Sequence, residues 1–157
     1  QPALGLRYTA GLGLGAFRNG RRIRIRDLGR NSELEREVIA TAERYRFARC
    51  GQARHFERLQ RTHPLIRSYA DCLGHTLAAE GAVGAMVDYG ARLWDIAATE
   101  LLITEAGGQW VETYRKPRHR SAAVYGVIFG KPKVVRWLLP FFQTGGRPQR
   151  RAFGGHG

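Results

Sequence analysis

The sequence predicts an α/β fold built in layers. Strand patterns and helix patterns alternate along the chain, which is typical of sheets covered by helices. Residues 121–129 are nearly all apolar, as expected for a strand inside a sheet. Residues 131–142 place apolar side chains at helical spacing, which predicts a helix with one face against the core.

A β-hairpin is predicted over residues 8–23, because Asn19-Gly20 is a strong tight-turn signal. After this turn, Ile23 and Ile25 alternate with arginines, as in a half-buried strand with a basic outer face. The glycines before the turn could also form a phosphate-binding loop, but no Gly-Lys-Ser/Thr sequence and no helix signal follow them. We therefore interpret the stretch as structural.

Helices are predicted in the next part of the chain. Ser32 and Glu35 form the pattern of a capping box, which predicts a short helix or a turn from Ser32 through about Ala42. The spacing of apolar residues predicts a second helix over residues 54–61 and a buried third helix over residues 71–80.

The C-terminal part continues the alternation. The expected elements are a strand over residues 83–88, a helix over 95–106, strands over 110–113 and 121–129, and a helix over 131–142. Gly107 suits the position after the first of these helices, and Pro132 suits the first turn of the second. In that last helix, the side chains expected to face the core are Val134, Val135, Leu138 and Leu139. Residues 143–157 are rich in Gly and Arg and are predicted to be a disordered tail, which leaves residues 1–142 as one domain.

Composition narrows the class of protein. A chain of 157 residues with 43% hydrophobic and 25% charged residues is typical of a soluble globular domain. No apolar run reaches the roughly 18 residues that a membrane-spanning helix needs, so we expect no membrane partner. Cys50 and Cys72 are the only cysteines and form no CxxC pair, which favours a reducing cytoplasm over a disulfide framework.

The chain is strongly basic, with 26 Lys and Arg against 13 Asp and Glu, a formal net charge of +13. Such a field attracts anions, including phosphorylated metabolites and nucleic acids. The arginines are scattered through every segment, and no RNP, zinc-finger or basic-zipper pattern accompanies them. Aromatic residues do not interleave with them as stacking platforms would. An inactive, basic nucleic-acid-binding module is therefore the weaker alternative.

The most specific motif lies between residues 93 and 108. Residues 93–98 read Leu-Trp-Asp-Ile-Ala-Ala, and residues 105–108 read Glu-Ala-Gly-Gly. A carboxylate such as Asp95 at the beginning of a helix could simply cap that helix, but it is also the ligand that Mg²⁺ prefers. The motif resembles the second signature of the inositol-monophosphatase family, which comprises magnesium-dependent phosphatases of small phosphate monoesters. This resemblance implies that Asp95 is a metal ligand, whereas Glu105, at the far end of the same helix, is interpreted as structural.

The resemblance extends from about Gly5 to Phe142. Residues 13–20 resemble a G-x-G-A-F-x-N-G hairpin that links the two halves of the family's fold, which is a layered αβαβα sandwich. Arg67 to Asp71, with Leu-Ala-Ala-Glu-Gly following at residues 77–81, is similar to histidinol-phosphatase-like members. The family's other metal ligands lie in a Glu-bearing segment and a DPxDGT-type motif, which have no counterpart here. The chain therefore resembles the C-terminal half of the sandwich plus the linking hairpin.

The resemblance also suggests substrate-binding residues. Asp88, at the end of the predicted strand before Asp95, matches an acidic residue that binds substrate hydroxyls, although it could be a solvated surface residue. Asp71 could contact substrate or cap its helix, and Arg67 could hold a phosphate or form a surface salt bridge. Two departures from the pattern stand beside these residues: the family's usual Gly and Asp are replaced here by Ala70 and Gly84.

The function implied is magnesium-dependent hydrolysis of a small phosphate monoester within a longer enzyme. Histidinol phosphate is the first expected substrate, and inositol or another sugar phosphate is the second. Because Asp95 would be one ligand among several, we assign no catalytic residue within this chain and expect the chain alone to be inactive. A small phosphorylated metabolite and Mg²⁺ are the expected partner and cofactor, and a homodimer stays open.

Overall fold

The computed structural model describes residues 1–29, 34–69, 71–118 and 121–142, apart from the side chains of residues 71, 118, 121 and 122. Its first half contains the 3-10 helices η1 (Pro2–Leu4) and η2 (Leu34–Arg36), strands β1 (Tyr8–Gly11), β2 (Gly15–Arg18), β3 (Arg21–Ile23), β4 (Ile39–Thr41) and β5 (Ile66–Ser68), and helices α1 (Arg44–Arg49) and α2 (Ala53–Thr62). Its second half contains helices α3 (Asp71–Ala79), α4 (Leu93–Glu105) and α5 (Pro132–Phe142), and strands β6 (Ala85–Ala91), β7 (Gln109–Arg118) and β8 (Ser121–Gly130).

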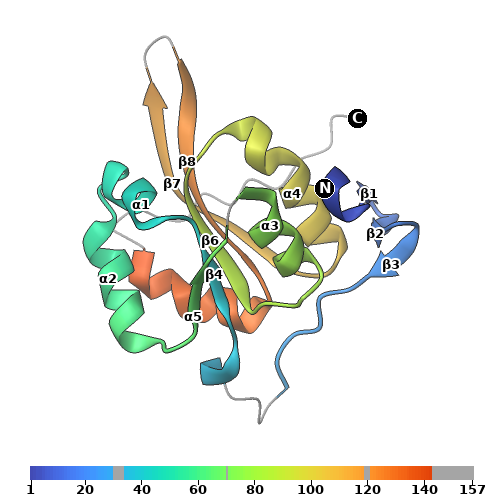
Figure 1. Ribbon diagram of the computed structural model, residues 1–157, viewed down its shortest axis with the longest axis horizontal. Helices are drawn as coiled ribbons and strands as arrows, with labels where there is room; N and C mark the ends of the chain where they lie inside the picture. The colour runs from blue at the N-terminus through green and yellow to red at the C-terminus, as the bar shows by residue number, and fades with distance from the viewer. Residues whose placement is uncertain (30–33, 70, 119–120, 143–157) are drawn as a thin grey trace.

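These elements form four successive layers (Figure 1). Strands β1 to β3 make a small sheet that packs against α4. Helices α3 and α4 separate it from a second sheet with the strand order β5-β4-β6-β8-β7. Helices α1, α2 and α5 cover the opposite face of that second sheet. The order β, α, β, α corresponds to four layers of the predicted αβαβα sandwich.

The N-terminal sheet is a meander with two turns. The predicted Asn19-Gly20 turn is confirmed: Asn19 has φ 48° and Gly20 has φ 77°, the left-handed pair that a tight hairpin requires. The single predicted hairpin is wrong in one respect, because residues 12–14 form a second turn and separate β1 from β2. The strand predicted after the Asn19-Gly20 turn is β3, which ends at Ile23. Ile25 lies beyond the end of this strand, where its side chain is buried.

Glu105 fixes this meander to the end of α4. Its Oε1 accepts a hydrogen bond of 2.9 Å from the Gly13 N–H, and its Oε2 accepts one of 2.8 Å from the Gly15 N–H. The interpretation of Glu105 as a structural residue agrees with these contacts.

Removing the Glu105 carboxylate should therefore loosen the meander. We expect Glu105→Ala to lower the free energy of unfolding by about 1–2 kcal/mol, since two backbone donors lose a charged acceptor. Urea unfolding followed by circular dichroism measures this change, with Glu35→Ala as the control because Glu35 is exposed. Equal midpoints for the two variants would show that the contacts contribute nothing.

The larger sheet is mixed. Strand β4 pairs in parallel with β5 and β6, whereas β8 pairs antiparallel with β6 and β7. Strand β8 lies inside the sheet, as its apolar sequence predicted. Hydrophobic side chains from this sheet form two clusters, one on each face. Val87 and Ile128 belong to the cluster under α1, α2 and α5, and Met86 and Phe129 belong to the cluster next to α3 and α4.

The short helix or turn predicted from Ser32 through about Ala42 is wrong in its later part. Ser32 lies outside the described residues, η2 spans only Leu34–Arg36, and strand β4 follows. The side chains of Ile39, Ala40 and Thr41 are all fully buried. Ile39 belongs to the hydrophobic cluster on one face of the sheet and Ala40 to the cluster on the other, so β4 is buried on both faces. Tertiary packing therefore outweighs the local capping pattern here.

The other elements differ from prediction mainly at their ends. Helices α2, α3, α4 and α5 are confirmed, and α4 begins at Leu93 rather than at Asp95. The predicted strand over residues 83–88 is β6, which runs on to Ala91, and β7 is longer than predicted. Helix α1 and strand β5 were not predicted. None of the described helices combines the length and the apolar character that crossing a bilayer requires, and the predicted tail at 143–157 lies outside the described residues.

Candidate functional site

Asp95 lies in the first turn of α4, directly after β6. Its Oδ2 accepts a hydrogen bond of 2.8 Å from the Arg92 N–H, and its own N–H donates one of 3.0 Å to the Arg92 carbonyl oxygen. Arg92, rather than Asp95, is thus the N-cap residue, which corrects the simple capping interpretation. The Asp95 side chain is exposed, and its role as a metal ligand remains a prediction.

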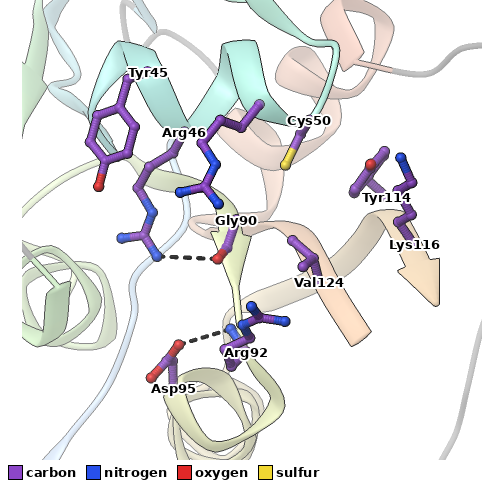
Figure 2. A pocket seen from close by; sticks show the side chains of 10 residues that line it. Tyr45, Arg46, Cys50, Gly90, Arg92, Asp95, Tyr114, Lys116 and Val124 are labelled. Atoms are coloured by element: carbon purple, nitrogen blue, oxygen red, sulfur yellow. Dashed lines mark hydrogen bonds between the residues drawn. The ribbon is translucent and has the colours of Figure 1, made fainter. Parts of the chain in front are cut away.

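A hollow of about 400 Å³ opens beside Asp95. Its lining comes from α1, the end of β6, the start of α4, and strands β7 and β8. The lining residues are Tyr45, Arg46, Arg49, Cys50, Gly90, Arg92, Asp95, Tyr114, Lys116 and Val124 (Figure 2). We call it the basic hollow, because four of its side chains are cationic.

A bulge in β6 shapes one wall of the basic hollow. The register with β8 shifts between Tyr89 and Ala91, and the intervening Gly90 has φ +86°, a conformation that only glycine adopts readily. The Gly90 carbonyl oxygen accepts a hydrogen bond of 3.4 Å from Arg46 Nη2, so the bulge anchors the guanidinium group (Figure 2).

Asp88 is not at a strand end. It lies in the middle of β6 and is 3% exposed, because its side chain points to the same face as Met86, toward α3 and α4. Its Oδ2 lies 3.0 Å from His75 Nε2, and His75 Nδ1 lies 3.0 Å from Thr99 Oγ1. The solvated-surface interpretation is therefore wrong, and the contact of Asp88 with a substrate remains a prediction.

The sequence analysis assigned no role to His75, which the structure places in this buried group. His75 is 5% exposed and Thr99 is 7% exposed, and with Asp88 they connect α3, α4 and β6. A histidine inside a predicted buried helix was the available signal, since a buried polar ring needs hydrogen-bond partners. The partners themselves are distant in sequence and could not be identified from it.

The other predicted substrate residues lie elsewhere. Arg67 is exposed on β5, the edge strand, and its Nη1 donates a 2.8 Å hydrogen bond to the Ile66 carbonyl oxygen. Asp71 begins α3, but its side chain lies outside the described part. The structure therefore does not bring Arg67 or Asp88 into the lining of the basic hollow with Asp95.

Of the two departures from the family pattern, Ala70 lies outside the described residues. Gly84 has a steric reason: a Cβ placed there would lie 2.8 Å from the Glu37 Cβ. Glu37 is held in turn by Lys131, whose Nζ lies 2.8 Å from each carboxylate oxygen. An aspartate at position 84 would require this ion pair to move.

Another carboxylate on α4, Glu100, is partly buried. Burial, and secondarily the negative charge of Glu112, raise the pKa of Glu100 above its usual value. The ionised form therefore disfavours the folded state, with no penalty below the pKa of the unfolded chain and a growing penalty as pH rises toward the folded pKa.

We accordingly expect Glu100→Gln to stabilise the fold at about pH 7 and to have no effect below about pH 3, where both states hold the proton. Urea unfolding at several pH values measures this difference. A variant less stable than wild type at neutral pH would contradict the sign.

The described residues hold no cluster of three or more His, Cys, Asp or Glu side chains close enough to share a metal ion. Asp95 thus supplies a carboxylate of the type that Mg²⁺ binds, but the described residues do not gather three such ligands at one site.

A model of the inositol monophosphatase family matches residues 1–139. Histidinol-phosphatase of Chlorobaculum parvum is 35% identical over 68% of this chain and 40% of its own length. Histidinol-phosphatase of Mycobacterium tuberculosis is 34% identical over 69% of this chain and 42% of its own length. Nus factor SuhB of Pseudomonas aeruginosa is 34% identical over 87% of this chain and 50% of its own length. The chain thus spans half or less of the length of these relatives.

Solved structures agree with this comparison. The Thermotoga maritima IMPase has a TM-score of 0.69 and 27% identity, with 90% of this chain and 52% of that chain covered. An inositol monophosphatase from Zymomonas mobilis has a TM-score of 0.75 and 22% identity, with 90% of this chain and 55% of that chain covered. Both show the same layered fold over most of the chain.

Proposed function

This chain belongs to the inositol monophosphatase family, and from that premise we propose that it forms the C-terminal part of a magnesium-dependent phosphatase of a small phosphorylated metabolite. The observation that carries the proposal is the position of Asp95, an exposed carboxylate in the first turn of α4 beside the basic hollow. The length of the relatives supports a longer enzyme, because the chain spans only 40–50% of them.

The residues present fit one share of a magnesium site. The Asp95 carboxylate is the preferred donor type, and the Arg92 N–H, bonded to Oδ2, fixes its orientation. The water-activating glutamate and the remaining carboxylates would come from the other part of the longer enzyme. A bound metal pair in such enzymes activates a water and stabilises the leaving oxygen. Within this chain, the Asp95 carboxylate would be one of the ligands that hold the metal ions.

Histidinol phosphate is the substrate that we propose first. Two relatives at 34–35% identity are histidinol-phosphatases, and the segment from Arg67 to Asp71 resembles such members. Inositol or another sugar phosphate is the second candidate, in line with the description of the family.

We also propose a cytoplasmic location, and both of the chain's cysteines are free, which agrees with it. A homodimer is a further proposal.

Nucleic-acid binding remains the third candidate, motivated by the net charge of +13. A titration with single-stranded RNA at increasing salt tests it, because a protein that neutralises several phosphates loses affinity steeply with salt.

The decisive experiment is a gain of function. Alone, with Mg²⁺ and histidinol phosphate, the chain should turn over far more slowly than about 1 per second, an ordinary enzymatic rate. A chimera that joins the N-terminal part of the Chlorobaculum parvum relative to this chain should recover magnesium-dependent activity. Ordinary turnover by the chain alone, or a folded chimera without phosphatase activity, would refute the proposal.

A further inference from the structure

Positively charged side chains outnumber carboxylates in the lining of the basic hollow. Its cationic side chains are Arg46, Arg49, Arg92 and Lys116, and Asp95 is the one carboxylate in the lining. Glu43 adds a second carboxylate nearby, 3.9 Å from Arg46. Cations therefore outnumber carboxylates two to one even with Glu43 included.

The cations reach the basic hollow from separate elements. Arg46 and Arg49 lie about one turn apart on α1, Arg92 precedes α4, and Lys116 lies on β7. The bond from Arg46 to the Gly90 carbonyl oxygen fixes one guanidinium group, and the Arg92 backbone is fixed by Asp95. In Figure 2 the labelled side chains surround the end of β6, with Tyr45 and Arg46 on one side and Lys116 on another.

Like charges gathered in a concave site create a strong local potential, because the low-dielectric walls focus the field. Guanidinium groups match carboxylate and phosphate oxygens by paired hydrogen bonds, and an ammonium group such as that of Lys116 adds a point charge. A volume of about 400 Å³ is within the range of small-molecule sites. It exceeds the space that a single phosphate group needs.

We propose that the basic hollow is a binding site for a small organic anion with at least two carboxylate or phosphate groups. The site is additional to the phosphate group that Asp95 would help to bind, and it does not depend on the chain being part of a phosphatase. Its ligand has two sources of the same chemistry: the anionic far end of a phosphate ester other than histidinol or inositol phosphate, whose far ends carry no acidic group, or a separate anion bound next to the substrate.

Calorimetric titration of the 157-residue chain, without metal and at physiological ionic strength, tests the proposal. Phosphoglycerate with its phosphate on the central carbon is compared with glycerol 2-phosphate, which has the same size and phosphate but a neutral hydroxymethyl group in place of the carboxylate. We expect phosphoglycerate to bind at least about tenfold more tightly, the effect of one additional charged hydrogen-bonded contact.

Matched variants separate the site from the general charge of the protein. Arg49→Gln with Lys116→Gln should weaken phosphoglycerate binding about tenfold or more, since both exposed side chains line the basic hollow. Arg54→Gln with Arg61→Gln removes the same charge from exposed positions on α2 and should change binding less than twofold. Equal weakening by both pairs of substitutions, or equal affinity for the two esters, would overturn the proposal. Such a result would mean that the anions are bound only by the general positive charge of the protein.

Succinate distinguishes the two sources. It has two carboxylates and no phosphate ester. Succinate that binds and competes with phosphoglycerate supports a separate anion as the ligand. Binding of phosphoglycerate alone supports the far end of a phosphate ester. Failure of all these probes to bind would sink the anion site while leaving the result of the chimera experiment intact.

Discussion

Replacing Asp95 by Asn should lower kcat at least about 100-fold in an active chimera of this chain, with the fold unchanged. A carboxylate that binds a cation contributes several kcal/mol to the charge balance of the transition state, and about 3 kcal/mol corresponds to a factor of roughly 100. Asparagine keeps the size of the side chain and an oxygen for the Arg92 N–H, so the capping bond survives. The expected loss is therefore in metal binding rather than in stability.

Two measurements decide between the roles of Asp95. The magnesium concentration for half-maximal activity should rise in Asp95→Asn, and the thermal unfolding midpoint should stay near that of the parent chimera. Glu35→Gln removes one charge from an exposed position and serves as the control. If Asp95→Asn kept both the kcat and the magnesium dependence of the parent chimera, Asp95 would be a helix-capping residue only.

Removing the Asp88 carboxylate should destabilise the fold by about 2–3 kcal/mol, the range for losing a buried hydrogen bond to a charged group. Asp88→Ala leaves the ring of His75, which is buried, without its partner at Nε2. The same loss should follow from His75→Ala, since the Asp88 carboxylate would then be buried without this partner.

Urea unfolding of the chain and of the double variant measures the coupling. Because the two side chains share one contact, the double variant should be more stable than the sum of the single losses predicts, by at least about 1 kcal/mol. Additive losses would mean that each residue contributes by packing alone.

Asp88→Ala in an active chimera also tests substrate contact. If Asp88 touches the substrate, the substitution should raise the KM for histidinol phosphate more than the KM for a generic phenyl phosphate ester.

Local signals predicted the parts of the fold that depend on few residues. The Asn19-Gly20 turn, the apolar spacing of α2 and α5, and the glycine after α4 at Gly107 each specify one piece of backbone, and the structure contains them. Strand β4 was not predicted, because its pairing with β5 and β6 and the burial of both its faces depend on residues distant in sequence. A helix-capping pattern also precedes it, at Ser32 and Glu35.

The candidate site divides in the same way. Asp95 could be found because its motif is contiguous in the sequence. The basic hollow could not, because its cations come from α1, from the residue before α4 and from β7, and α1 itself was not predicted. In a chain with 26 Lys and Arg, only the folded arrangement shows which cations share one concave surface. Asp88 was found but misplaced at a strand end, since β6 continues to Ala91, and its partner His75 is contributed by α3.

The division of the basic hollow among several elements has a consequence for how such a site can diversify. Arg49 and Lys116 are exposed and belong to elements other than α4, so substitutions at either position leave the backbone around Asp95 untouched. Changes in ligand preference can then accumulate one residue at a time without disturbing the turn that holds Asp95, because specificity resides in a site grafted onto the fold. Natural variation among related chains should consequently be greater at Arg49 and Lys116 than at Asp95.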